Sequence, residues 1–101
     1  MKSIVFVYIT NPSKDEAKRV AKHLLGKQLI GCANIFKVAA MYPREGTLAD
    51  ENESVLIAKT TEDNFDRVKQ EVEEIHPFTI PCIVKIPVRP TKSLLSGLVT
   101  Q

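Results

Sequence analysis

The sequence predicts an α+β fold with its elements in the order β-α-β-β-α-β, and three observations support this. The chain opens with an apolar run, Ile4 to Ile9, that is rich in β-branched and aromatic residues. Two later segments, around Val20 and Val68, carry apolar residues at helical spacing. Strand-like segments flank each of the two helical segments. This order is that of the split βαβ arrangement, which is also called ferredoxin-like.

The chain of 101 residues is predicted to form one domain, residues 1–101. Its hydrophobic fraction of 44% and charged fraction of 26% are ordinary for a soluble globular protein. A net charge of +2 without a basic run gives no reason to expect a nucleic-acid partner. The first apolar run is too short for a secretion signal, and no stretch approaches the roughly 20 apolar residues of a membrane span. Cys32 and Cys82 are therefore expected to be reduced thiols in the cytoplasm.

The first strand and the first helix follow from simple patterns. Residues 4–9 are apolar at every position, which predicts a central strand buried on both faces. Ser13 is a good helix N-cap, and Glu16 stands three residues further on, as in a capping box. Gly26 weakens the helix end, and a short tail as far as Leu29 stays open. One helix face is apolar: Ala17, Val20, Ala21, Leu24 and Leu25.

The second and third strands are predicted to form a long hairpin. Residues 32–42 alternate between two faces, as a strand does. Pro43 and Gly46 disturb the pattern and predict a kink or bulge. The acidic run 50–53 is interpreted as a solvated lead into the third strand, residues 54–60.

The second helix is predicted to start at Thr61 or Asp63 as its cap. Its buried stripe consists of Phe65, Val68, Val72 and Ile75. The helix ends at His76, because the following Pro77 disfavours helical geometry in the residue before it. Residues 79–88 predict the fourth strand, and the tail beyond it is weakly helical.

With right-handed crossovers, both helices cover one face of a sheet with strand order 4-1-3-2. The first and third strands are apolar on both sides, so the second face also needs a cover. The chain has no spare element for that face, and a partner subunit is the simplest cover. We therefore expect a homo-oligomer, whose subunit contacts add to a modest monomer core and make it very stable.

Four motifs in this order point to a known family. They are Cys32-Ala33-Asn34-Ile35, Tyr42-x-x-Glu45-Gly46, Lys59-Thr60-Thr61 and His76-Pro77-Phe78-x-x-Pro81. From Ile4 to about Val88 the chain resembles the CutA1 divalent-cation-tolerance family. The resemblance implies a ferredoxin-like homotrimer whose long hairpins extend the sheets across subunits. It also implies a role linked to copper and other divalent metals.

Three positions depart from the pattern of this family. Arg44 stands where the family usually has Trp, and the segment 94–97 replaces a usual aromatic pair. Both changes remove aromatic side chains from the family's cleft. Cys82 stands where Glu is common, and this alters a position near the expected metal site.

Cys32, His76 and Cys82 are the candidate metal ligands, because together they form a soft set suited to Cu(I) or Zn(II). Singly, each also has a plainer interpretation: a histidine bonded to the last helix carbonyls, and cysteines packed as small apolar residues. The second and fourth strands are opposite edges of the sheet, separated by roughly 14 Å. Only pairing between the edges of neighbouring subunits would bring Cys32 toward His76 and Cys82. No obligatory cofactor is expected, and Cu or Zn is the candidate metal.

An alternative function is that of a PII-like signalling trimer that binds a small anionic ligand or a partner protein in clefts between subunits. Lys59 and Tyr42 are its candidate ligand-binding residues. A lysine at a strand end more often extends its charge into solvent along an apolar surface. A purely structural trimer is a third hypothesis. The chain lacks a Gly-rich phosphate loop and a Ser-His-Asp constellation, so we predict that it is not an enzyme.

Overall fold

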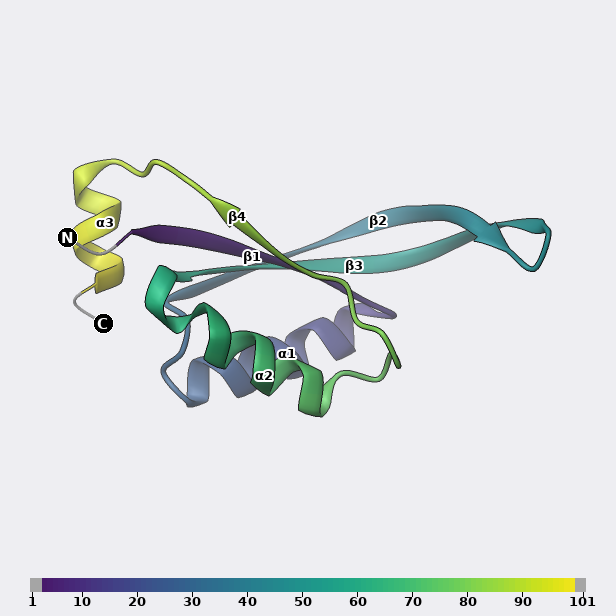
Figure 1. The fold of residues 1–101 in the computed structure, drawn as a ribbon, viewed down its shortest axis with the longest axis horizontal. Helices are drawn as coiled ribbons and strands as arrows, with labels where there is room; N and C mark the ends of the chain where they lie inside the picture. Colours follow the sequence, from purple (N-terminus) through teal and green to yellow (C-terminus); the bar gives the residue numbers. More distant parts are fainter. Residues whose placement is uncertain (1–2, 100–101) are drawn as a thin grey trace.

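The computed structural model describes residues 3–99, which form a four-stranded antiparallel sheet with two helices on one face. Figure 1 shows α1 and α2 packed together on that face, and the β2–β3 hairpin reaching beyond them as an arm. The α+β class and the order of the first six elements are as predicted. The elements are β1 (Ile4–Asn11), α1 (Lys14–Gly26), β2 (Cys32–Arg44), β3 (Thr47–Thr61), α2 (Phe65–Ile75), β4 (Ile83–Pro87) and α3 (Lys92–Val99), with a 3-10 turn (Glu62–Asn64) before α2.

The strands lie in the order β2-β3-β1-β4, which is 4-1-3-2 when it is read from the other edge. All three neighbouring pairs are antiparallel. β1 and β3 are therefore the central strands, and β2 and β4 each leave one edge unpaired within the chain. These two free edges matter for assembly, because an unpaired edge can accept another strand.

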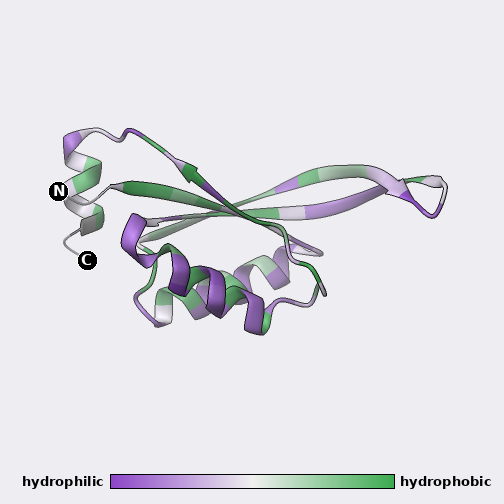
Figure 2. Ribbon diagram, in the orientation of Figure 1, coloured by the Kyte–Doolittle hydropathy of each residue, from purple (hydrophilic) through white to green (hydrophobic). Residues whose placement is uncertain are grey.

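The core lies between the sheet and the two helices. Figure 2 shows the apolar central strands and the polar outer sides of both helices. The fully buried side chains of this layer include Val5, Val7 and Ile9 of β1, Leu56 of β3, Val20 and Leu24 of α1, and Val68 and Val72 of α2. Because alternate residues of a strand share a face, the intervening residues of β1 and β3 lie on the other side of the sheet.

The start of α1 confirms the predicted cap. The Ser13 hydroxyl oxygen accepts a hydrogen bond of 3.1 Å from the backbone N–H of Glu16. The helix ends at Gly26, so the tail toward Leu29 is not helical. Gln28 instead takes a positive φ of 58°, which turns the chain back toward the sheet.

The two helices are tied together by charged groups. Glu71 of α2 lies 2.9 Å from the Lys27 ammonium and 2.7 Å from the His23 ring. Hydrogen bonds from Lys27 and His23 lower the pKa of the Glu71 carboxyl. Arg19 of α1 also donates to the carbonyl oxygen of Ile75, at 2.6 Å, where α2 ends. These contacts hold α1 and α2 as one layer.

The hairpin arm is longer and more regular than predicted. Its register is unbroken from the Cys32–Lys59 pair to the Arg44–Thr47 pair, so the predicted kink or bulge is wrong. Glu45 and Gly46 both have positive φ, as a two-residue hairpin turn requires. The irregular backbone that we expected as a bulge within a strand is therefore confined to this turn.

Pro43 is tolerated because β2 is an edge strand, where a missing N–H can face solvent. The acidic run 50–53 belongs to β3 and is not a loop before it, so that interpretation was wrong. Cross-strand pairing extends β3 through residues that have low strand propensity by themselves.

The segment between α2 and β4 also differs from the prediction. α2 begins after Asn64, so neither predicted residue is its cap, although Thr61 precedes the 3-10 turn. β4 covers only residues 83–87, and residues 77–82 are irregular. Pro81 has no N–H to donate to a ladder, which is consistent with the late start of the strand.

α3 forms in the tail that the sequence marked as weakly helical. Leu98 of α3 is buried, and it lines one cavity together with Thr60 and Thr61. The prediction that no element covers the second face is therefore wrong at this end of the sheet. Figure 1 shows that α3 stays at this end and leaves the rest of that face uncovered.

Candidate functional site

His76 sits at the corner that the sequence predicted, with an extended backbone of φ −73° and ψ 139°. Its ring is buried, and its Nε2 donates to the carbonyl oxygen of Thr10 at 2.7 Å. Its Nδ1 accepts from the backbone N–H of Phe78 at 3.1 Å. One tautomer, with the hydrogen on Nε2, satisfies both partners. A metal ion at His76 must displace one of these two bonds.

These hydrogen-bond partners differ from those expected if His76 only bonded the last carbonyls of the helix. The ring does not bond the last carbonyls of α2. It joins β1 to the loop that leads into β4, and it also contacts the ring of Phe78, at 4.9 Å between centroids. His76 therefore fixes the position of the corner as a whole.

We expect His76→Ala to destabilise the protein by about 1–3 kcal/mol, because Thr10 and Phe78 lose their hydrogen-bond partner at a buried position. Urea denaturation of the metal-free protein measures this loss. His23→Ala is the comparison variant: it removes a half-exposed ring whose partner Glu71 keeps its bond to Lys27, so we expect a smaller loss than for His76→Ala. If His76→Ala unfolds at the same urea concentration as wild type, the ring does not hold the corner.

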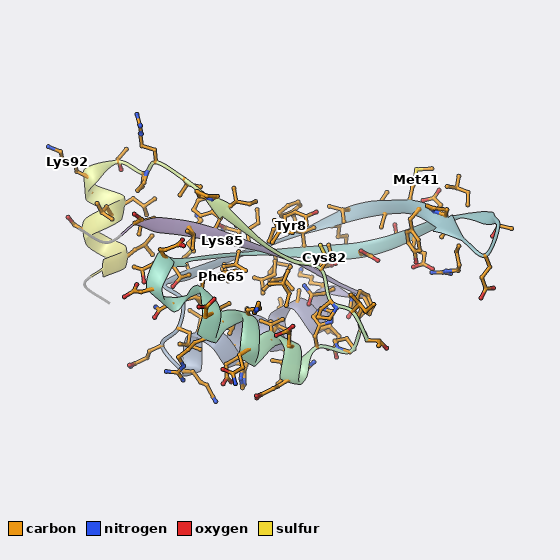
Figure 3. The ribbon with its side chains drawn as sticks, in the orientation of Figure 1. Tyr8, Met41, Phe65, Cys82, Lys85 and Lys92 are labelled. Carbon is orange, nitrogen blue, oxygen red and sulfur yellow. The ribbon has the colours of Figure 1, made fainter. Side chains whose placement is uncertain are left out.

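Cys82 lies at the same corner as His76. Its carbonyl oxygen accepts from the backbone N–H of Thr10 at 3.4 Å, while His76 bonds the carbonyl of that residue. The Cys82 residue is exposed, and Figure 3 shows it where the chain enters β4. His76 and Cys82 thus both bond the backbone of Thr10, and a shared metal site stays a prediction.

Cys32 is not part of this corner within one chain. It begins β2, on the opposite edge of the sheet, and its register partner is Lys59. Both thiols are free, as predicted. Among residues 3–99, no three His, Cys, Asp or Glu side chains are grouped closely enough to hold a metal ion. The predicted ligand set therefore requires a second subunit.

Lys59 and Tyr42 are also far apart in one chain. The Lys59 ammonium lies over the ring of Phe6, at 5.5 Å from its centroid. Tyr42 pairs with Ala49, ten residues before Lys59 on β3, or about 33 Å along the strand. The two residues line no common site within one subunit.

Tyr42 belongs instead to a small network on the arm. Its hydroxyl donates to Glu51 at 2.9 Å, and Arg44 donates to both residues. The guanidinium also lies 5.1 Å from the centroid of the Tyr42 ring. Hydrogen bonds from Arg44 and Tyr42 lower the pKa of the Glu51 carboxyl, and the bond to Glu51 raises the pKa of Tyr42. Arg44, where the family usually has Trp, thus caps the tyrosine ring with a cation.

The side of the sheet away from α1 and α2 is apolar, and we call it the open face. Figure 3 shows Tyr8 on this side. Register pairs place Phe6, Tyr8, Phe36, Ile57, Val84 and Ile86 there. Phe36 and Val84 are 44% and 46% exposed, although both are large apolar residues. The alternation in β1 and β3 predicted this face, but the contributions of β2 and β4 were missed.

Comparison with known proteins finds one family model and several relatives that match most of this chain. Residues 5–95 match the model of the family described as CutA1 divalent ion tolerance protein. A divalent-cation tolerance protein CutA from Archaeoglobus fulgidus is 43% identical over 83 residues, which is 82% of this chain and 81% of the relative. Its counterpart from Pyrococcus horikoshii is 38% identical over 85 residues, which is 84% of this chain and 83% of the relative.

Solved structures agree over the same length. A crystal structure of the divalent ion tolerance protein CutA1 from Ehrlichia chaffeensis superposes with a TM-score of 0.96 at 30% identity, covering 99% of this chain and 95% of the other. The structure described as the periplasmic divalent cation tolerance protein CutA from Archaeoglobus fulgidus has a TM-score of 0.91 at 40% identity, covering 96% of both chains. The agreement extends across the helices, the sheet and the arm.

Proposed function

The chain belongs to the CutA1 divalent ion tolerance protein family, and from that premise we propose that it is a homotrimeric divalent-cation tolerance protein that binds soft metal ions between its subunits. It has no obligatory cofactor and is not an enzyme. The open face supports this proposal most strongly. Its apolar side chains need to be covered, and within residues 3–99 α3 covers only one end of this face.

Two features of the sheet support the proposed trimer. The open face carries half-exposed aromatic and aliphatic side chains, and a partner that buries them gains hydrophobic free energy. The free edges of β2 and β4 can pair with strands of neighbouring subunits. Such a contact between two different surfaces is heterologous, and in the proposed trimer its rotation closes into a three-fold ring. Subunit burial then stabilises the fold, which is the basis for the expected thermostability.

The metal site is proposed to combine Cys82 and His76 of one subunit with Cys32 of its neighbour. Cys82 is exposed on the β4 side, and Cys32 is half-buried on β2. The proposed site requires these two edges to pair in the register that sets Cys32 of one chain opposite Cys82 of its neighbour. Two thiolates and an imidazole favour Cu(I) or Zn(II) over hard cations. His76 would join by giving up its bond to Phe78, the longer of its two hydrogen bonds.

Titration of the trimer with Cu(I) against a competing chelator tests this site. We expect wild type to bind one ion per cleft, and Cys32→Ser and Cys82→Ser each to abolish competition with the chelator. Uptake should weaken as pH falls, because protons compete for thiolate and imidazole ligands. Native mass spectrometry with and without metal reports subunit count and stoichiometry together.

His23→Ala serves as the control, since it removes a surface histidine that is not part of the proposed site. If the His76→Ala, Cys82→Ser double variant competes with the chelator as well as wild type does, these residues do not bind metal. If His76→Ala alone retains binding while both cysteine variants lose it, the site is a thiolate pair that His76 only supports.

The alternative function is that of a PII-like signalling trimer that binds a small anion in the clefts between subunits. Lys59 favours it, because this half-buried ammonium has no carboxylate partner within residues 3–99 and faces the open side of the sheet. Binding of an anionic metabolite that Lys59→Ala abolishes, without any effect of metal, would favour this alternative over metal tolerance.

The compartment remains a prediction. No helix among residues 3–99 is long and apolar enough to cross a membrane. Relatives carry different compartments in their names, since one is called periplasmic and a rice relative is called chloroplastic. We propose the cytoplasm for this chain, where thiol ligands stay reduced.

A further inference from the structure

A cavity of about 370 Å³ lies where α1 begins, on the helix side of the arm. Lys14 of α1 and Lys37 of β2 both line it, together with Ser13 and Ser54. A smaller neighbouring cavity of about 120 Å³ is lined by the same two lysines and by Ser54. Two elements that are distant in sequence thus each contribute a lysine to the lining of one hollow.

Neither lysine is neutralised by the protein. Within residues 3–99, the ion pairs of the structure involve other cations, and neither Lys14 nor Lys37 takes part in one. Among nearby carboxylates, Glu16 is already paired with Arg19 at 2.8 Å. Two positive charges beside one cavity therefore have no ion-pair partner within residues 3–99.

Glu53 also lines the cavity, and its charge would oppose an anion. Its neighbour Ser54 is the register partner of Lys37, so Ser54 and Lys37 share the helix side of the hairpin. Alternation along the strand directs the Glu53 side chain to the opposite face, where its partner is Val38. Asp15, in the first turn of α1, is the remaining negative group near the helix start.

The start of α1 adds further donors. The Ser13 oxygen accepts from Glu16, which leaves its O–H free to donate to a ligand. Ser13 accepts the backbone N–H groups of Glu16 and Ala17, which leaves those of Lys14 and Asp15 without a partner within the helix. The helix dipole favours negative charge at this end. Hydroxyl, amide and ammonium donors thus meet at one place.

The wall beside the cavity has an unfilled acceptor. Asn11 is completely buried between Pro12 and its register partner Ser54, both of which line the cavity. Its Nδ2 donates to the carbonyl oxygens of Ile9 and Ser54. Its Oδ1 has no partner in the described part of the chain. This polar wall suits a ligand that brings hydroxyl groups or water better than it suits an apolar one.

We propose that this cavity binds the phosphate group of a small phosphomonoester, with Lys14 and Lys37 as the charged ligands and the start of α1 as the donor of neutral hydrogen bonds. The cavity volume falls in the range of about 300–1,000 Å³ that is typical of small-molecule sites, which leaves room for an organic part beside the phosphate. The site is on the helix side, so it stays accessible when the open faces associate. It depends neither on the proposed metal site nor on Lys59.

Calorimetric titration of the full-length protein, in its native oligomeric state, with glycerol phosphate tests this proposal. We expect saturable binding that the Lys14→Ala, Lys37→Ala double variant weakens at least about tenfold, since bonds from ammonium groups to phosphate are charge-assisted. The matched control is Lys18→Ala, Lys22→Ala, which removes the same charge from exposed positions of the same helix. Circular dichroism verifies that both double variants are folded.

Titration with inorganic phosphate distinguishes the two sources of the phosphate group. Binding of glycerol phosphate in preference to inorganic phosphate identifies a phosphomonoester site, whereas equal binding identifies a phosphate site without use of the organic part. Equal weakening by the two double variants would show only a general charge effect and would overturn the proposal. Absence of binding by wild type would overturn it as well, and loss of binding in Lys59→Ala alone would place the anion in the cleft between subunits.

Discussion

Replacing Ile57 by aspartate is expected to turn the trimer into monomers. Ile57 lies near the middle of the open face, on a central strand between its register partners Tyr8 and Asn34. In a trimer that buries this face, the variant places three unpaired carboxylates in apolar contacts. A buried charge without a partner costs several kcal/mol, and the cost recurs in every subunit.

Sedimentation velocity at micromolar concentration measures this change directly. Wild type should sediment as one trimeric species and Ile57→Asp as a monomer that still has the circular dichroism of a folded α+β protein. The monomer should also melt earlier, because it has lost the stability that association supplies. A trimer of unchanged size in the variant would show that the open face is not the subunit interface.

Leu25→Asp is the control for this experiment. Leu25 is 43% exposed, similar to the large residues of the open face, but it lies on α1, on the other side of the sheet. The substitution adds the same charge at an exposed position on the helix side of the molecule. It should leave the trimer intact, so that any loss of assembly in Ile57→Asp is a property of the open face and not of added charge.

The elements were largely predictable because their signals are local. Residues 4–9 of β1 are apolar at every position, Ser13 and Glu16 form the cap of α1, and the His76-Pro77 pair ends α2. Each signal depends on residues within one turn or one strand. The order of these elements then restricts the topology to very few arrangements.

The limits of β2 and β3 were not predictable in this way. Residues 50–53 are acidic or amide and have low strand propensity, yet they belong to β3 because the hairpin register continues past them. The positive φ values at Glu45 and Gly46 fix that register. Had the Glu-Gly pair been interpreted as a two-residue turn, counting outward would have paired Tyr42 with Ala49 and placed Glu51 on the same face.

The candidate site shows a second limit of prediction from the sequence, which concerns contacts between distant residues. The carbonyl that His76 bonds belongs to Thr10, 66 residues earlier in the chain, and no local pattern indicates it. His76 and Cys82 both bond the backbone of Thr10, whereas the third predicted ligand depends on a contact between chains. Pattern and residue chemistry therefore predict which groups are available. They do not predict which of those groups are already occupied by hydrogen bonds.

Leu56→Ala is expected to cost about 2–5 kcal/mol of unfolding free energy per subunit. Leu56 is completely buried, and its register partners Ile9 and Ile35 lie on the helix side of the sheet. Truncation removes buried methyl groups and leaves a cavity, because α1 holds its distance from the sheet through many other contacts. Leu56 and Ile57 are neighbours in sequence, yet they face opposite layers.

Leu56→Ala and Ile57→Asp should therefore differ in whether they first lower the stability of the fold or first break up the trimer. Leu56→Ala should unfold at lower urea concentration while it still sediments as a trimer, whereas Ile57→Asp should lose the trimer first. Leu25→Ala is the matched control for the truncation, because the same atoms are removed from an exposed position, and its effect should stay within about 0.5 kcal/mol. Dissociation of Leu56→Ala at concentrations where it remains folded would show that both faces of β3 support assembly. The separation of core and interface between alternate residues of this strand would then be wrong.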